Sequence, residues 1–320
     1  AERASSRLLV LDRKSGAVLH RRFHELAEYF KPGDALVIND TKVFKARLFG
    51  RKESGGRIEV LLVREREDGL WEALVDKSRR VREGSQVVFD DGSFLTVEQK
   101  ERTRIRVRFD RPAREVIGAN GVVPLPHYIR RPADEKDQAT YQTVYAKNEG
   151  SIAAPTAGLH FTDAVLEELK DRGATIAELT LHVGPGTFKP IRAETIEKHE
   201  MEPEFFEILE TAAEKINTAR RIIAVGTTAA RTLEYAARNR SGVGDQQKIE
   251  PSSGWADIFI YPGFQFRVVN ALVTNFHLPG STPLLLVCAL AGKDLIFKAY
   301  AEAIREKYRF YSYGDAMLIL

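Results

Sequence analysis

The chain has 320 residues, enough for one large domain or two smaller ones, and 43% of them are hydrophobic and 29% charged. A formal net charge of +3 is too small to require a nucleic-acid partner, so the position of the charges matters more than their sum. No apolar run reaches membrane-spanning length. Cys288, the single cysteine, excludes a disulfide framework and argues against a cysteine zinc site. We therefore expect a cytoplasmic enzyme that does not bind membranes.

The N-terminal part has the texture of an α/β fold. Residues 8–12 and 35–39 are predicted strands, and residues 24–30 between them have helical spacing. The second strand ends on Asn39-Asp40-Thr41-Lys42, and polar residues at this end of a strand are a common ligand-binding position in α/β folds. A solvated turn is the alternative for this stretch.

Residues 47–111 change to short alternating strands separated by glycine-bearing turns such as Asp68-Gly69 and Glu83-Gly84. Strands that recur about every ten residues without helices between them indicate a small antiparallel barrel. Because helical texture lies on both sides, we expect the barrel to be inserted into a larger α/β domain.

Four arginines recur at every second position within residues 102–109. In a strand this spacing puts all four on one face, which suits contact with nucleic-acid phosphates. The predicted tRNA-binding residues are Arg79, Arg80, Arg102, Arg104, Arg106 and Arg108. A solvated outer face of a half-buried strand explains the same pattern.

Residues 150–162 form a loop of small residues with Pro155, Gly158 and His160. Proline fixes φ and glycine permits close approach by another group. A helix signal follows at once, with Thr162 as the N-cap and Gly173 as the stop. A structural turn with a hydrogen-bonded histidine is the alternative to a functional loop.

Similar loops recur downstream. His182 precedes Gly184-Pro185-Gly186, and His277 precedes a Leu-Pro-Gly turn. The strand before Gly226 leads through Thr227-Thr228 into a helix, an arrangement that suits a negatively charged ligand. Turn chemistry explains the glycines and prolines but not a histidine in three loops, so we expect one composite pocket with acid–base groups. His199 and Glu202 could ligate a metal, but a solvated pair is the favoured interpretation, and no metal site is predicted.

Taken together, several segments resemble the S-adenosylmethionine:tRNA ribosyltransferase-isomerases of queuosine biosynthesis, over nearly the whole chain. They are residues 153–162 (Ala-Ala-Pro-Thr-Ala-Gly-Leu-His-Phe-Thr), 181–188 (Leu-His-Val-Gly-Pro-Gly-Thr-Phe), 225–228 (Val-Gly-Thr-Thr), 254–263, 274–279 and 313–317. Where the family usually shows an Asn-Asn-Thr-Arg-like segment, this chain has Asn39-Asp40-Thr41-Lys42. The family also begins roughly twenty residues earlier, so we expect a preceding segment.

The resemblance implies an α/β domain, residues 1–45 and 126–320, interrupted by a β-barrel at 46–125. It implies transfer and isomerisation of the ribosyl group of S-adenosylmethionine onto 7-aminomethyl-7-deazaguanine in a tRNA anticodon, giving epoxyqueuosine-tRNA and releasing adenine and methionine. S-adenosylmethionine is then a consumed substrate, and no cofactor is implied. A monomer is expected.

This chemistry needs a base to remove the proton beside the sulfonium, and histidine suits that task near neutral pH. His160 and His182 are the first candidates, His277 the third, and Asp40 the alternative if none serves. The sulfonium favours aromatic faces, here Phe161, Trp255 or Tyr261, although core packing explains each of them too. The methionine carboxylate suits Thr227, Thr228 and Arg231. The other predicted substrate-binding residues are Asn39, Asp40, Pro155, Thr156, Gly158, Gly184, Gly186 and Gly226.

Two other classes of protein share some of these features. A methyltransferase also binds S-adenosylmethionine, but a glycine-rich first strand-to-helix turn followed by an acidic residue is not evident. A tRNA-binding protein without catalysis would explain the arginines and not the histidine loops.

Overall fold

The structure is a computed structural model that describes residues 3–66, 68–76, 79, 81–126, 129, 131, 133–188, 191, 193–238 and 248–320. It divides into two compact units. The larger contains Ala1–Thr41, Thr143–Asn148 and Pro155–Leu320, and the smaller contains Lys42–Gln142 and Glu149–Ala154. The smaller unit is therefore inserted into the sequence of the larger one.

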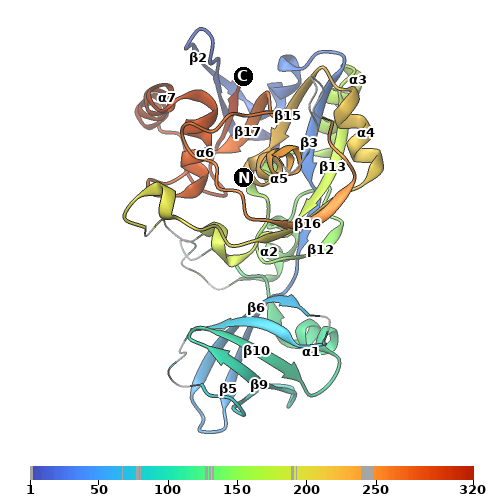
Figure 1. The fold of residues 1–320 in the computed structure, drawn as a ribbon, viewed down its shortest axis with the longest axis vertical. Helices are drawn as coiled ribbons and strands as arrows, with labels where there is room; N and C mark the ends of the chain where they lie inside the picture. The colour runs from blue at the N-terminus through green and yellow to red at the C-terminus, as the bar shows by residue number, and fades with distance from the viewer. Residues whose placement is uncertain are drawn as a thin grey trace. The chain divides into compact units, whose positions relative to one another are not determined.

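Nine strands form the sheet of the larger unit, in the order β16-β14-β13-β3-β15-β17-β18-β1-β2 (Figure 1). Their bounds are β1 Arg7–Leu11, β2 Val18–Arg22, β3 Asp34–Asn39, β13 Thr175–Leu181, β14 Glu204–Ile208, β15 Arg221–Val225, β16 Ser252–Ala256, β17 Ala271–Asn275 and β18 Ala316–Ile319. The four central strands β13, β3, β15 and β17 are parallel. All six residues of β3 are buried, as expected for a strand covered on both faces.

Helices pack on this sheet and complete its core. They are α3 Asp163–Asp171, α4 Glu210–Thr218, α5 Gly226–Arg238, α6 Thr282–Ala291 and α7 Lys293–Arg305, with short 3-10 helices at Arg3–Ser5, Phe23–Tyr29, Thr156–His160, Pro185–Phe188 and Ile196–Lys198. Helix α5 lies against β3, β15 and β17 (Figure 1). Thr162 caps α3 by accepting a hydrogen bond from the Val165 amide, as the sequence predicts. The core between helices and sheet includes Leu36, Ile38 and Phe161.

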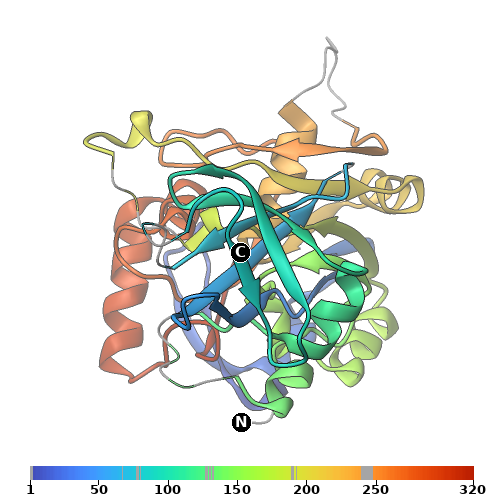
Figure 2. The ribbon, with the colours of Figure 1, turned by 90° about the horizontal axis from the view of Figure 1, so that it is seen from below.

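Six strands of the smaller unit close into a barrel, because β5 pairs with both β6 and β8. Figure 2 shows these strands, in blue to teal, from below. The strands are β5 Arg47–Lys52, β6 Arg57–Glu65, β7 Trp71–Val75, β10 Arg104–Phe109, β9 Phe94–Glu101 and β8 Gln86–Val88, and β11 Gly121–Val122 adds to β5. A Cβ on Gly50 would lie 2.5 Å from a Val87 methyl group, so the closing strand needs glycine there.

The barrel interior is filled by every second residue of its strands. Trp71, Ala73 and Val75 of β7 point inward and are buried, while the residues between them are partly exposed. The remaining elements are α1 Ala113–Asn120, α2 Glu135–Thr140, β4 Thr41–Val43 and β12 Asn148–Ser151. This architecture confirms the predicted fold class, an α/β domain interrupted by a small antiparallel barrel. The predicted limits of the insertion, 46 and 125, stay a prediction.

Within the described part of the chain, every helix is too short or too polar to cross a bilayer.

Candidate functional site

The start of α5 follows the predicted order of strand, glycine turn and helix, but the helix begins at Gly226, so Thr227 and Thr228 lie inside it and do not precede it as a cap. Strand β15 ends at Val225, and Gly226 turns the chain into α5 with φ +82°. A residue with a side chain would be strained in this left-handed conformation. The first turn of α5 carries no acidic side chain. Its amide groups and the helix dipole therefore favour a negative ligand at Thr227 and Thr228.

Arg231 lies one turn further along α5 and is 6% exposed. Its Nη1 donates to Glu204 Oε2 at 2.6 Å, and its Nε donates to the Ile258 carbonyl oxygen at 3.2 Å. The second carboxylate oxygen of Glu204 accepts from the Gly184 amide at 2.9 Å. Glu204, 3% exposed on β14, therefore fixes the loop after β13 and the start of α5 relative to each other.

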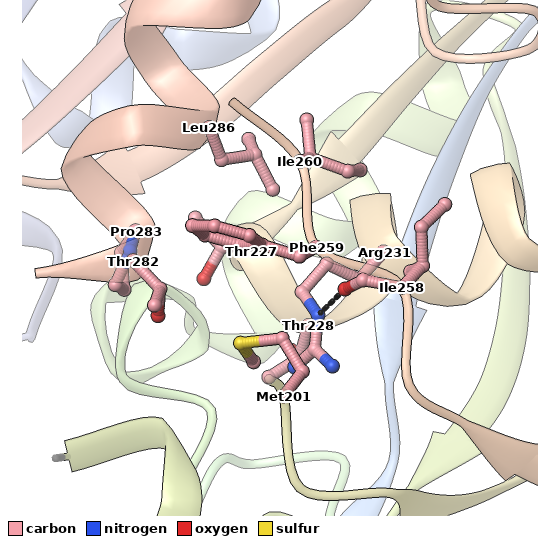
Figure 3. Close-up of a pocket in the computed structure, with 10 residues that line it drawn as sticks. All are labelled: Met201, Thr227, Thr228, Arg231, Ile258, Phe259, Ile260, Thr282, Pro283 and Leu286. Carbon is pink, nitrogen blue, oxygen red and sulfur yellow. Dashed lines mark hydrogen bonds between the residues drawn. The ribbon is translucent and has the colours of Figure 1, made fainter. Parts of the chain in front are cut away.

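Two buried polar atoms beside this ion pair have no partner among the described residues. They are Nη2 of Arg231 and the hydroxyl oxygen of Thr228. Both residues line a narrow pocket that is partly open to solvent. Figure 3 draws the lining residues, which are Met201, Thr227, Thr228, Arg231, Ile258, Phe259, Ile260, Thr282, Pro283 and Leu286. An unpaired buried donor costs free energy, so these two atoms suit a ligand that brings an acceptor.

The polar run Asn39-Asp40-Thr41, which begins at the last residue of β3, bonds residue by residue to the end of β13 and to His182. Asn39 exchanges two hydrogen bonds with the backbone of Leu181, at 2.9 and 3.0 Å. The Thr180 hydroxyl donates to Asp40 Oδ1 at 2.7 Å, and Thr41 Oγ1 lies 2.7 Å from His182 Nδ1. Asn39 is fully buried and its side-chain groups are occupied, so its predicted contact with substrate does not fit this geometry. It holds the loop that carries His182.

Asp40 is a buried carboxyl group whose side-chain partners are neutral. Beside the Thr180 hydroxyl, Asn148 Nδ2 donates to Asp40 Oδ2 at 3.1 Å. Burial raises the pKa of Asp40, and these two hydrogen bonds limit the rise. Both carboxylate oxygens of Asp40 accept hydrogen bonds, and these bonds hold the end of β13 in place. To act as an acid or base, Asp40 would first have to give up one of them.

His182, like His277, is half-buried. Its Nδ1 is bonded to Thr41, and its ring stacks on Phe205 with the centroids 5.7 Å apart. Burial lowers its pKa, which keeps the ring neutral near pH 7. No described residue bonds its Nε2. With Nδ1 donating to Thr41, Nε2 carries the lone pair that a base needs.

His160 is buried in the core with both ring nitrogens bonded. Asn275 Nδ2 donates to its Nε2 at 3.0 Å, which leaves Nδ1 to donate to the Ser6 hydroxyl at 2.8 Å. Its ring packs on Phe23 at a centroid distance of 5.1 Å. Burial lowers its pKa to about 4. As a base, His160 would first have to give up a hydrogen bond in the core.

His277 is tied into its own turn. Its Nε2 bonds Thr274 Oγ1 at 2.8 Å, and its backbone amide donates to the Tyr300 hydroxyl. Burial lowers its pKa to about 4. These contacts fit the structural turn that Pro279 suggests.

The loop around His160 owes its small residues to packing. A Cβ on Gly158 would lie 2.1 Å from the Tyr145 hydroxyl oxygen, so a side chain there has no room. Pro155 is buried before the 3-10 helix that Thr156 opens. Phe161 is 0% exposed and packs edge-on against Phe23 at 4.9 Å. Phe161 is thus a core residue, and its predicted contact with the sulfonium does not fit.

The other predicted pocket residues lie around β14 and β16. A Cβ on Gly186 would meet Glu202 Cβ at 2.8 Å, so packing explains that glycine. A Cβ on Gly184 would make only ordinary contacts with Glu204, whose carboxylate accepts from the Gly184 amide. Trp255 is 45% exposed and packs against Phe205, the residue that stacks on His182. Tyr261 lies 5.1 Å from Phe259, ring to ring.

Three of the predicted tRNA-binding arginines lie on β10, where Arg104, Arg106 and Arg108 alternate with buried Ile105 and Val107. Arg102 does not belong to this strand. It stands in the turn from β9 with φ +57°, so the predicted strand of residues 102–109 begins two residues too early. Arg79 is exposed, and Arg80 lies outside the described residues.

The arginines of β10 have different side-chain partners on the neighbouring strand β9. Arg106 Nη1 donates to the Gln99 side chain at 2.6 Å, whereas Arg108 Nε lies 3.5 Å from a Glu98 carboxylate oxygen. Among the described residues Arg106 forms no ion pair and bonds the neutral amide of Gln99, while Glu98 partly offsets the charge of Arg108.

Several residues in the pocket or bonded to its lining are absent from the sequence-based prediction. Glu204 reads as one acidic residue among many, because its partners Arg231 and Gly184 are 27 and 20 positions away. Phe259 enters the pocket where Tyr261 was expected, because β16 ends at Ala256 and residues 258–260 continue without regular structure. Among the described residues no three His, Cys, Asp or Glu side chains cluster as metal ligands, and His199 packs against Phe259.

Comparison with known proteins covers nearly all of the chain. The family model described as "Queuosine biosynthesis protein" matches residues 1–319. The chain is 49% identical to a protein of Caldanaerobacter subterraneus subsp. tengcongensis named "S-adenosylmethionine:tRNA ribosyltransferase-isomerase", over 100% of this chain and 94% of that protein. A protein of the same name from Pelobacter propionicus is also 49% identical, with 99% and 94% covered.

A solved structure is similar as well. It is the crystal structure of S-adenosylmethionine tRNA ribosyltransferase from Thermotoga maritima, with 38% sequence identity and a TM-score of 0.54. The match covers 99% of this chain and 93% of that one.

Proposed function

Because the chain belongs to the queuosine biosynthesis protein family, we propose that it transfers and isomerises the ribosyl group of S-adenosylmethionine onto 7-aminomethyl-7-deazaguanine in a tRNA anticodon. The product is epoxyqueuosine-tRNA, and adenine and methionine are released. S-adenosylmethionine is consumed as a substrate, and the reaction uses no cofactor. The protein acts as a monomer in the cytoplasm.

The observation that carries this proposal is the placement of His182. The reaction begins when a base removes a proton from the carbon bonded to the sulfonium. A neutral imidazole with Nδ1 anchored to Thr41 and Nε2 not bonded by any described residue is such a base. Asn39 and Asp40 support it by fixing Leu181 and Thr180, the last two residues of β13 before His182. His160 and His277 are structural in this proposal.

The row of arginines on β10 supports the proposal that tRNA is a binding partner. Arg104, Arg106 and Arg108 lie on one strand at alternate positions, so their charges fall on the same side of the barrel wall. Phosphate oxygens are the groups that such a row of guanidinium groups binds, without reading base sequence.

One incubation tests the proposed reaction. The protein is mixed with S-adenosylmethionine and tRNA that carries the 7-aminomethyl-7-deazaguanine base, and the small products are separated. Adenine and methionine in equal amounts are expected, with a modified tRNA. S-adenosylhomocysteine instead would show methyl transfer, and no product with intact tRNA binding would show a binding protein; either result contradicts the proposal.

A further inference from the structure

The pocket at the start of α5 contains an incomplete hydrogen-bonding site. Arg231 uses Nη1 and Nε on Glu204 and Ile258, but its Nη2 is buried without a partner. The Thr228 hydroxyl, 6% exposed on the preceding turn, also has none. Both side chains line the same pocket. Two unpaired groups in one place, at a helix N-terminus, indicate a missing acceptor with negative charge.

The surroundings narrow the class of ligand. Apart from Arg231 and the threonines, the pocket wall is apolar, with Met201, Ile258, Phe259, Ile260, Pro283 and Leu286. A phosphate would bring two charges and little apolar surface, and Glu204 already compensates one positive charge. A single carboxylate on a short apolar chain suits both parts of the wall. The methionine portion of S-adenosylmethionine offers such a carboxylate, on a short chain that also carries the α-ammonium group and ends at the sulfonium.

We propose that this pocket binds the α-carboxylate of the methionine portion of S-adenosylmethionine, with Arg231 Nη2 and the Thr228 hydroxyl as donors. This inference rests on the proposed function for the identity of the substrate. Glu204 is a positioning residue, because it holds the guanidinium so that Nη2 is left for the ligand. It also links this subsite to the Gly184 loop that follows His182.

The test compares S-adenosylmethionine with its decarboxylated analogue, which lacks only the carboxylate. Dissociation constants for both are measured by calorimetry on the full chain and on Thr228→Val and Arg231→Lys. Valine keeps the shape of threonine, and lysine keeps a charge for Glu204 but loses the spare donor. Each variant should bind S-adenosylmethionine about tenfold more weakly or worse. Each should bind the decarboxylated analogue as tightly as the unchanged protein does.

Thr232→Val is the matched control. The Thr232 hydroxyl, one turn further along α5, donates to the Thr228 carbonyl oxygen and does not line the pocket. This variant should lose some thermal stability and keep its preference for the carboxylate. In the absence of ligand, Thr228→Val should have an unchanged or higher Tm, because it removes a buried unpaired hydroxyl.

Two results would overturn the inference. One is equal weakening for both compounds in Thr228→Val and Arg231→Lys, and the other is an unchanged protein that binds both compounds equally well. The proposed reaction is judged separately, by adenine release from the unchanged protein. A protein that releases adenine but does not discriminate the two compounds refutes the subsite alone.

Discussion

The three loop histidines differ in how many ring nitrogens are bonded. His160 has both nitrogens engaged, at 2.8 and 3.0 Å, and is buried. His182 is half-buried and has one nitrogen engaged, by Thr41. A base needs a lone pair that substrate can reach, whereas a histidine with two bonded nitrogens contributes to stability. The two residues should therefore respond to substitution in opposite ways.

Substituting His182→Gln should lower the single-turnover rate of adenine release by about 10²- to 10⁴-fold. Glutamine can keep the bond to Thr41 but cannot accept the proton, so substrate affinity and Tm should change little. His160→Gln is the comparison, with a lower Tm and a near-normal rate in the folded fraction. A near-normal rate in His182→Gln would show that another residue is the base, and Asp40 would be the next candidate.

His160 and His277 should also make stability depend on pH. The pKa of His160 and of His277 is about 4 in the folded chain, against an ordinary value of 6.5. Above pH 6.5 both are neutral in either state. Between pH 6.5 and 4 the unfolded chain binds protons that the folded chain does not, so stability falls as pH falls, by about 3 kcal/mol for each histidine.

Urea unfolding at several pH values measures this loss. His160→Gln should be less stable at pH 7 but lose less stability on acidification than the unchanged protein does. His24→Gln, at an exposed histidine, should leave the pH dependence as it was. If His160→Gln and the unchanged protein lose the same amount between pH 6.5 and 4, His160 is not held neutral by burial.

The sequence indicates which loops carry histidines but not how each ring is bonded. The partners of His160 are Ser6 and Asn275, which lie 154 and 115 positions away. Such pairs are brought together by the order of strands in the sheet. The local spacing of residues in the sequence does not predict this order. Turn chemistry is local, so the roles of Thr162 and Gly226 could be predicted correctly.

At the scale of elements, β10 combines an apolar inner face with a basic outer one. The alternation of Arg104 to Phe109 follows the period of a strand and was readable from sequence. The same alternation extends back to Arg102, yet the chain turns there with φ +57°. Residue types alone did not reveal this, because the turn uses arginine where glycine or asparagine is usual.

Arg106→Ala should weaken tRNA binding and flatten its dependence on salt by roughly one unit of the log–log slope. The charge of Arg106 faces the neutral amide of Gln99, so it is available to a phosphate. Arg108→Ala should change the slope less, because Glu98 already offsets that charge. Filter binding between 50 and 200 mM salt, roughly the range in which phosphate contacts are lost, measures both.

Arg114→Ala controls for net charge alone. Arg114 is exposed on α1, outside β10, and its substitution by alanine removes the same charge from the same unit. Its slope should match the unchanged protein. If all three variants flatten the slope equally, binding follows net charge, and the face of β10 has no special part in it.

For the whole molecule, two separate hydrophobic cores accompany the two binding sites that we propose. One core contains Leu36, Ile38 and Phe161 of the larger unit, and the other contains Val60, Leu62 and Trp71 of the barrel. The sequence indicated this division through the change from helical to strand texture near residue 47. It did not reveal the strand order, in which β13 lies beside β3 although about 135 residues separate them, because pairing of distant strands depends on how the whole chain packs.

This division predicts that changes in the two units act independently. Thr228→Val changes the proposed site for S-adenosylmethionine in the larger unit, and Arg106→Ala changes the proposed tRNA contact of the barrel. In the double variant, the Kd for S-adenosylmethionine should equal that of Thr228→Val alone, and the Kd for tRNA should equal that of Arg106→Ala alone. Independent sites usually add within about 0.5 kcal/mol.

Titrating each ligand in the presence and absence of the other makes the test complete. Equal affinities in both conditions, for all four proteins, are expected if each unit binds its own ligand. A coupling of about 1 kcal/mol or more would contradict independence and would have to be reciprocal, because each ligand must alter the affinity for the other by the same factor. Its loss in only one of the two single variants would then identify the unit through which the ligands are linked.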